Sequence, residues 1–178
     1  MYQKVVSVFC ASRPTEAQYN AALELGQLLA ENHFTIISMG FESFEYMNGG
    51  NGGCMEAMAI GCRRVKDSRC IGVTVPTDLP VESTPYVTET IQAANMLDRI
   101  NILCTRSDII VALPGYLGTL NEIMMAITFN YITDSNGRPK KRMFVSRQPW
   151  EPIWKSVCDE LNARMECIRE SSIFSGFL

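Results

Sequence analysis

Residues 108–122 have the sequence DIIVALPGYLGTLNE, in which an apolar run is followed at once by two glycines, a threonine and a glutamate. The run from Asp108 to Leu113 is short, rich in β-branched residues and free of polar alternation, which is typical of a parallel strand buried on both faces. Residues 118–131 then show a helical pattern. In open α/β sheets a ligand lies where a strand ends and its loop leads into a helix. This stretch therefore predicts the fold class and the position of a binding site.

Similar apolar runs lie on both sides of this stretch, and helical patterns separate them. The predicted strands cover residues 4–10, 34–39, 69–75, 108–113 and 142–145, and the predicted helices cover residues 19–30, 54–65, 93–105, 118–131 and 150–165. Thr15 and Gln18 have the spacing of a capping box at the start of the first helix. Strand–helix alternation along the whole chain predicts an α/β fold, a Rossmann-like doubly wound parallel sheet with helices on both faces.

The composition favours a single domain spanning residues 1–178. Of the 178 residues 47% are hydrophobic, so the chain can form one full core but is short for two. Its net charge is −3 and it contains no block of like charges, which argues against a nucleic-acid partner. No apolar run reaches the roughly 20 residues that a membrane-spanning helix needs, so no membrane partner is expected.

The seven cysteines point to buried thiols rather than to a metal site. Their number is odd, and none of them lies in the close pairs that are typical of zinc ligands, so no metal is expected. Free thiols persist in a reducing compartment. The N-terminal residues 1–10 also lack the length and the flanks of a signal peptide. We therefore expect a cytoplasmic protein.

Two loops at the predicted carboxyl edge of the sheet are rich in glycine. Gly115, Gly118 and Thr119 follow the strand described first, and NGGNGG at residues 48–53 follows an earlier strand. Glycine lets the backbone turn sharply and approach a ligand, and the N–H groups at the start of a helix favour an anion such as phosphate. We expect the first loop to form a phosphate cradle, with the threonine hydroxyl as a further donor. Neither loop matches the dinucleotide fingerprint or the P-loop.

A glutamate and an arginine are the candidate reactive groups at this edge. Glu122 follows the glycines by one helical turn, and Arg99 lies in the preceding predicted helix. Each has a structural alternative, because Thr119 and Glu122 have the spacing of a capping box and an arginine within a helix is mostly exposed. Both predicted helices begin near the same edge of the sheet, which favours a joint functional role. Ser12, in the loop after the first strand, is a further candidate for ligand contact.

Several motifs in these loops are similar to those of one known family. PGYLGTLNE at residues 114–122 resembles the PGGxGTxxE signature of the LOG-type phosphoribohydrolases, the Lonely guy family of cytokinin-activating enzymes long described as lysine decarboxylases. MLDR at residues 96–99 lies where that family has a Met-His-x-Arg-Lys element. SVFCAS at residues 7–12 and GGNGGCM at residues 49–55 resemble its opening strand and its second glycine loop. The resemblance covers roughly residues 5–154.

The resemblance implies a homodimer that hydrolyses the N-glycosidic bond of a nucleoside 5′-monophosphate, of the AMP or N6-substituted AMP type, to free base and ribose 5-phosphate. It implies neither a cofactor nor a metal. Arg99 and Glu122 would form the catalytic pair, with the arginine binding phosphate or ribose hydroxyls and keeping the carboxylate ionised. The apolar stripes at residues 126–127 and 150–154 would offer a dimer surface. The implied substrate and phosphate contacts are Gly115, Gly118, Thr119, Ser12, Gly52, Gly53, Met96 and Tyr116.

Three features depart from the family pattern and concern substrate choice more than reaction type. Tyr116 stands where the signature has its second glycine, so its side chain would narrow the pocket or close over the ligand. Ile100 replaces the lysine of the Met-His-x-Arg-Lys element and removes one cation. Residues 41–48 separate the second strand from its glycines, which follow at once in the family.

Two other functions have to be weighed against this pattern. Lysine decarboxylation is disfavoured because it needs a lysine that forms a Schiff base with pyridoxal phosphate, and no lysine lies in the loops at the carboxyl edge. A non-catalytic carrier of a nucleotide or of the molybdenum cofactor is the alternative, since such carriers share this architecture. The presence of both Arg99 and Glu122 favours the enzyme.

Overall fold

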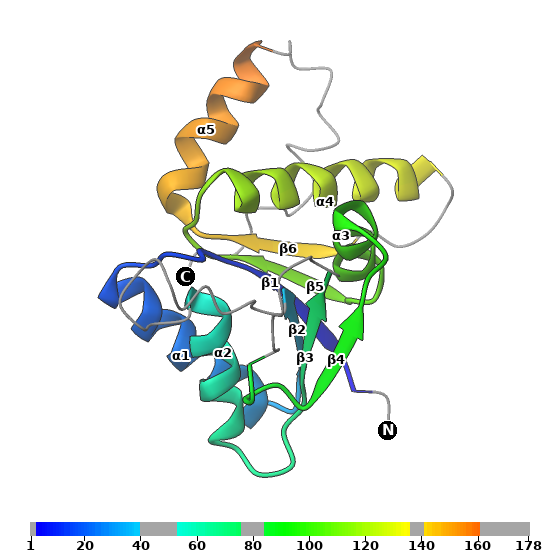
Figure 1. Ribbon diagram of the computed structural model, residues 1–178. Helices are drawn as coiled ribbons and strands as arrows, with labels where there is room; N and C mark the ends of the chain where they lie inside the picture. Colours follow the sequence, from blue (N-terminus) through cyan, green and yellow to red (C-terminus); the bar gives the residue numbers. More distant parts are fainter. Residues whose placement is uncertain (1–2, 40–52, 76–83, 136–140, 161–178) are drawn as a thin grey trace.

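The computed structural model of the protein describes residues 3–39, 53–75, 84–135 and 141–160. In these residues helices alternate with the strands of one sheet (Figure 1). The strands are β1 (Val5–Phe9), β2 (Thr35–Met39), β3 (Cys70–Thr74), β4 (Glu89–Gln92), β5 (Ile109–Ala112) and β6 (Arg142–Val145). The helices are α1 (Glu16–Glu31), α2 (Gly53–Arg63), α3 (Met96–Thr105), α4 (Leu117–Ser135) and α5 (Arg147–Glu160).

The strands are arranged in the order β4-β3-β2-β1-β5-β6, and every neighbouring pair is parallel. From β1 the chain passes through α1 to β2 on one side of β1. The strand β5, which follows α3, pairs with β1 on its other side. The order of the strands therefore reverses between β1 and β5. The carboxyl ends of the strands beside such a reversal are where open α/β sheets bind their ligands.

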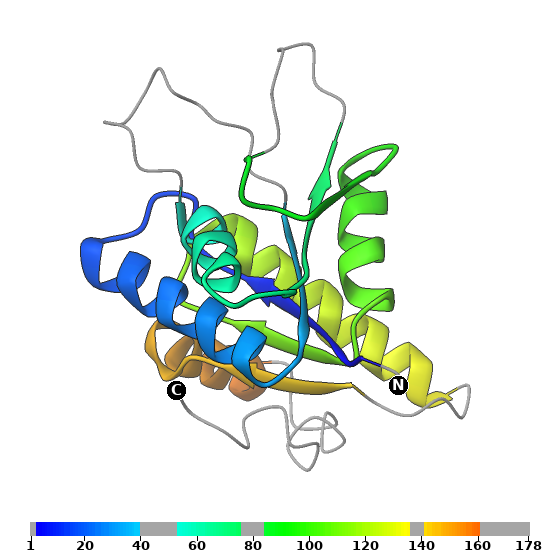
Figure 2. The same cartoon turned by 90° about the horizontal axis from the view of Figure 1, so that it is seen from below.

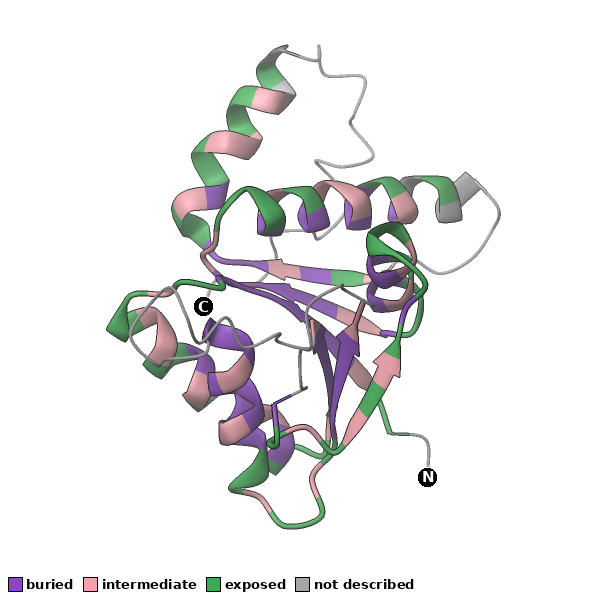
Figure 3. Cartoon of the chain, viewed as in Figure 1, coloured by how far each residue is buried: buried purple, intermediate pink, exposed green. Residues whose placement is uncertain are grey.

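Two apolar cores lie on the two faces of the sheet, so the fold has three layers. One core joins α1 and α2 to the sheet, and the other joins α3, α4 and the start of α5 to it (Figures 1 and 2). Successive strand residues face opposite cores: Val8 of β1 packs with Met58 of α2, whereas Phe9 packs with Leu103 of α3. The central strands are the most buried part of the sheet (Figure 3). This two-sided burial explains why their sequences are apolar without alternation.

The structure confirms the predicted parallel α/β fold and adds one strand. The five predicted strands are present, with ends that differ from the expected ones by at most one residue, and the capping box of Thr15 and Gln18 starts α1. The sequence pattern does not predict β4, because Glu89–Gln92 alternates half-buried and exposed residues and contains no apolar run. This strand lies at an edge of the sheet and pairs only with β3. An edge strand does not need apolar residues on both faces.

The start of α3 is set by two reciprocal hydrogen bonds. Oδ1 of Asn95 accepts from the N–H of Asp98 at 2.9 Å, and Oδ2 of Asp98 accepts from the N–H of Ala94 at 2.9 Å. The helix therefore begins at Met96, three residues after the expected start, because these side chains satisfy N–H groups that the first turn leaves open. The bonds fix the turn that carries Arg99.

Some predictions lie outside the described residues. They concern the glycine loop up to Gly52, the extra residues 41–48 and the predicted helix beyond Glu160. Within the described ranges, none of the helices combines the length and the apolar character that a membrane span requires.

Candidate functional site

The loops after β1 and β5 are joined by hydrogen bonds where the strand order reverses. The N–H of Leu113, directly after β5, donates to the carbonyl of Phe9 at 2.9 Å. The hydroxyl of Thr119, in the first turn of α4, donates to the carbonyl of Cys10 at 3.2 Å. Thr119 is 3% exposed, so this bond is shielded from water. The bonds hold the start of α4 against the end of β1.

The start of α2 approaches the same loop so closely that it requires glycine. The N–H of Cys54 donates to the carbonyl of Ala11 at 2.9 Å. Gly53 has a φ of +44°, and a Cβ atom there would lie 3.0 Å from the carbonyl oxygen of Ser12. Any other residue would strain both the backbone and this contact. The first residue of α2 therefore lies against the β1–α1 loop, which places Gly53 next to Ser12.

The glycines of the β5–α4 loop differ in what surrounds them. A Cβ atom at Gly115 would lie 2.2 Å from Oγ1 of Thr119, so glycine is required for the hydroxyl to reach its partner. A Cβ atom at Gly118 would have no heavy atom within 4 Å. Gly118 therefore leaves open space at the start of α4, where backbone N–H groups favour an anion. The geometry is compatible with the predicted cradle, although the Thr119 hydroxyl already donates to the protein.

Arg99 and Glu122 are both buried. This differs from the structural alternatives, in which Arg99 is exposed and Glu122 caps its own helix. Arg99 is 8% exposed and Glu122 is 3% exposed. The helix α4 begins at Leu117, so Thr119 lies inside it and cannot form a capping box with Glu122. Within the described part of the chain, Oε1 of Glu122 has no hydrogen-bond partner. A buried carboxyl oxygen without a protein partner is costly unless a ligand or solvent contacts it.

Burial raises the pKa of Glu122 from 4.5 to about 8, and the charge of Arg99 offsets only part of this effect. Contrary to the expectation, the charge of Arg99 alone does not keep the carboxylate ionised. The desolvation of a carboxylate that is 3% exposed outweighs the attraction of one neighbouring cation. Glu122 is mostly neutral at pH 7, and a pKa close to the working pH suits a group that exchanges protons.

The Arg99 side chain spans the gap between α3 and the end of β2. Its Nη2 atom donates to Sδ of Met39 at 3.2 Å. Met39 is the last residue of β2, and sequence reasoning did not select it for the site. Its position at the carboxyl end of a buried strand is the signal that could have identified it.

The charge of Glu122 affects the pKa of two nearby thiols, those of Cys10 and Cys104. A hydrogen bond with Cys54, burial and the Glu122 charge raise the pKa of Cys10 well above its usual value. Burial, with a smaller contribution from Glu122, raises the pKa of Cys104 to about 12. Both groups stay protonated near neutral pH, so neither has the thiolate form that a nucleophile needs.

The remaining predicted contacts differ in how they relate to this arrangement. Tyr116 is 58% exposed, and its hydroxyl donates to the carbonyl of Arg13 at 2.8 Å. Met96 is 53% exposed at the first residue of α3, and Ile100 is 3% exposed in the core. Gly52 lies outside the described residues. The structure thus joins Ser12, Gly53, Gly115, Tyr116 and Thr119 around the β1–α1 loop.

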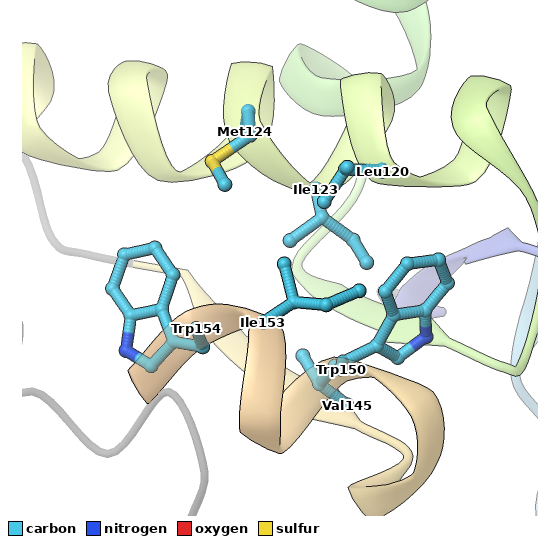
Figure 4. Close-up of a pocket in the computed structure, with 7 residues that line it drawn as sticks. All are labelled: Leu120, Ile123, Met124, Val145, Trp150, Ile153 and Trp154. Atoms are coloured by element: carbon cyan, nitrogen blue, oxygen red, sulfur yellow. The ribbon is translucent and has the colours of Figure 1, made fainter. Parts of the chain in front are cut away.

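An apolar pocket lies between α4 and α5 (Figure 4). It is lined by Leu120, Ile123, Met124, Val145, Trp150, Ile153 and Trp154. None of these residues can transfer a proton or pair with an anion at neutral pH. In the described ranges there is also no group of three or more His, Cys, Asp or Glu that could hold a metal ion. We therefore assign the candidate site to the edge between β1 and β5.

The fold and this edge define a class: Rossmann-like α/β proteins with a glycine-rich site where the strand order reverses. The model of the SLOG cluster4 family matches residues 3–132 of the chain. A relative from Mycobacterium tuberculosis (strain ATCC 25618 / H37Rv), named cytokinin riboside 5′-monophosphate phosphoribohydrolase, is 30% identical over 129 residues. The matched region makes up 71% of this chain and 64% of that relative, which is less than two thirds of its length. The chain belongs to the SLOG cluster4 family, and its resemblance to LOG-type proteins is confirmed.

Solved structures agree on the fold. The molybdenum cofactor binding protein from the phototrophic bacterium Rippkaea orientalis has a TM-score of 0.66 at 22% identity, over 89% of this chain and 86% of that one. The molybdenum cofactor carrier protein from Chlamydomonas reinhardtii has a TM-score of 0.66 at 21% identity, over the same shares of the two chains. At such identities the likeness shows the fold alone.

Proposed function

We propose that the protein is a phosphoribohydrolase that cleaves the N-glycosidic bond of a nucleoside 5′-monophosphate. The substrate would be of the AMP or N6-substituted AMP type, and the products would be the free base and ribose 5-phosphate. The name of the 30% identical relative supports this reaction class. We further propose that the protein acts in the cytoplasm as a homodimer on this small-molecule substrate, with no cofactor or metal.

The observation that carries the proposal is the pairing of Arg99 with Glu122 next to the β5–α4 loop. The two residues come from different helices, both are buried, and the charge of the arginine acts on the carboxyl group. Cleavage of a ribosyl C–N bond builds positive charge on the sugar, which a nearby carboxylate stabilises. An arginine and a carboxyl group at one edge match the needs of a sugar that carries hydroxyls and a phosphate.

The pKa of Glu122 near 8 supports a proton-transfer role in addition to charge stabilisation. In its neutral form, Glu122 would donate its proton to the departing base. The carboxylate left behind would stabilise the developing sugar cation and accept a proton from the attacking water, which restores the neutral form. Arg99 would orient the ribose or phosphate through its planar guanidinium.

The test is release of base and ribose 5-phosphate from AMP and from N6-substituted AMP, followed by chromatography. We expect Glu122→Gln to lower kcat by at least about 10²-fold, because it removes the proton-transferring group. Glu24→Gln is the matched control, since Glu24 is exposed in the middle of α1. Near-normal product release by Glu122→Gln would refute the assignment of this residue.

A carrier of a nucleotide or of the molybdenum cofactor is the alternative function. The solved structures with these names share the fold, and a carrier would bind its ligand at the same edge. The buried pair of Arg99 and Glu122 favours the enzyme, because a carrier has no need of a proton donor with a pKa near 8. Tight binding of AMP by the wild-type protein without release of adenine would favour the carrier instead.

A further inference from the structure

Tyr116 makes a hydrogen bond that has no part in the proposed roles of Arg99 and Glu122. Its side chain is 58% exposed, yet its hydroxyl donates to the carbonyl of Arg13 at 2.8 Å. The bond joins residues 103 positions apart in the sequence. It connects the loop after β5 to the far end of the loop after β1, and it fixes the main chain of Arg13 where the strand order reverses.

Three carbonyl groups of the loop that ends at Arg13 accept hydrogen bonds from other segments. The carbonyl of Cys10 accepts from the first turn of α4, and the carbonyl of Ala11 accepts from the start of α2. The carbonyl of Arg13 accepts from the hydroxyl of Tyr116. A loop held by hydrogen bonds at three of four successive residues loses little further entropy when it binds a ligand.

We propose that Arg13 binds the phosphate of the nucleotide and that Tyr116 positions it through the bond to its carbonyl. This inference rests on the proposed function for the class of substrate. It assigns the two arginines to different parts of the ligand. Arg13 contacts the phosphate at the surface, and Arg99 contacts the ribose beside Glu122.

The difference in burial between Arg99 and Arg13 supports their assignment to different parts of the ligand. Arg99 is 8% exposed and its charge acts on Glu122, so it lies deep at the site. Arg13 is exposed, and its main chain is bonded to the side chain of Tyr116, the residue directly before α4, whose first N–H groups favour an anion. A guanidinium binds a phosphate through two parallel N–H···O bonds, which makes arginine suited to this position.

The test compares AMP with adenosine, which lacks the phosphate, in the full-length protein. We expect Arg13→Gln to raise KM for AMP and Kd for inorganic phosphate about 10-fold or more, because a charge-assisted hydrogen bond is lost. Its kcat for AMP and its Kd for adenosine should stay close to the wild-type values. Arg13→Lys should restore part of the affinity for phosphate, since it keeps the charge but not the two-bond geometry.

Tyr116→Phe removes only the hydroxyl and tests the positioning role. We expect a smaller rise of about 3-fold in KM for AMP, and no further rise when it is combined with Arg13→Gln, because both changes act on one interaction. Arg63→Gln is the matched control. Arg63 is exposed at the opposite end of α2 from Gly53, and its loss removes the same charge.

Each outcome bears on the inference. An unchanged KM and an unchanged phosphate affinity in Arg13→Gln would overturn it, and so would equal losses for AMP and adenosine or for Arg63→Gln. If the wild-type protein binds AMP through Arg13 but releases no adenine, the proposed hydrolysis fails and the inference stands. A wild-type protein that binds neither AMP nor inorganic phosphate would overturn both.

Discussion

Glu122 occupies a position that favours its neutral form. It is 3% exposed, its Oε1 atom has no hydrogen-bond partner within the described residues, and burial raises its pKa to about 8. In the unfolded chain the same group ionises near pH 4.5. Between these values the folded state binds more protons than the unfolded state. The contribution of Glu122 to stability is therefore fully present below pH 4.5 and is lost as the pH rises through 8.

Glu122→Gln tests this linkage, because glutamine stays neutral at every pH. We expect its unfolding free energy to rise relative to that of the wild type by about 2 kcal/mol between pH 5 and pH 7. Urea unfolding followed by circular dichroism at several pH values measures the difference. Glu24→Gln, at an exposed position, should show no such trend. A difference between Glu122→Gln and the wild type that does not change with pH would mean that Glu122 is already ionised at pH 5.

Thr119→Val tests the hydroxyl that links the two loops. The change keeps the shape of the side chain but removes the bond to the carbonyl of Cys10, which is buried. We expect a higher KM for AMP, no change in adenosine affinity, and a loss of about 1 kcal/mol in unfolding free energy. Thr128→Val is the control, since the hydroxyl of Thr128 donates to the carbonyl of Met124 at 2.9 Å on the exposed side of α4. Equal effects on AMP and adenosine would argue against a phosphate role.

At the scale of elements, α1 and α2 are in backbone contact through two glycines. A Cβ atom at Gly26 would lie 2.2 Å from the carbonyl oxygen of Met58, and one at Gly61 would lie 2.0 Å from the carbonyl oxygen of Leu23. The helical patterns predict both helices, but they do not reveal this approach. It depends on which residues of one helix face the other, and that follows only from packing.

Gly26→Ala and Gly61→Ala should each destabilise the protein by about 1–3 kcal/mol or more, because the added methyl group meets backbone atoms that cannot rotate away. Gly118→Ala is the control, since no heavy atom lies within 4 Å of the added Cβ and alanine favours a helix. It should leave stability unchanged or raise it slightly. Thermal unfolding measures all three, and similar melting temperatures for the wild type and Gly26→Ala would show that the helices can separate at low cost.

The sheet shows how far a local pattern can predict an element. The five strands with continuous apolar runs were predictable, because burial on both faces demands such runs. Only the pairing with β3 identifies β4 (Glu89–Gln92) as a strand, since its residues are half-buried at best. Its hydrogen bonds come from a neighbour that is distant in the sequence, so no window of local sequence contains the signal.

At the scale of the whole molecule, the expected dimer surface needs revision. Ala126 and Ile127 were expected to offer apolar area, but they are 1% and 5% exposed and belong to the core. Trp150 is also buried, at 4%. The apolar pocket between α4 and α5 and the exposed Ile132 on α4 remain as the candidate surface (Figure 4).

We predict that the protein is a homodimer through this surface and that Ile132→Glu dissociates it, because an ionised carboxylate is costly in an apolar interface. Leu28→Glu is a matched control, since Leu28 on α1 is 53% exposed and Ile132 is 52% exposed. Light scattering coupled to gel filtration gives the mass of each. A wild-type mass equal to one chain over a range of concentrations would contradict the prediction.

The sequence by itself determined the parallel α/β class, and it predicted the edge of the sheet with the candidate site and Arg99 and Glu122 as candidate residues. Apolar runs, helical spacing and glycine after a strand are local patterns, so they can be recognised without coordinates. The tertiary structure alone decided the strand order, the neutral form of Glu122 and the bond between Tyr116 and Arg13. Desolvation and contacts between distant segments arise only when the chain packs, because both depend on what surrounds a group in space rather than along the sequence.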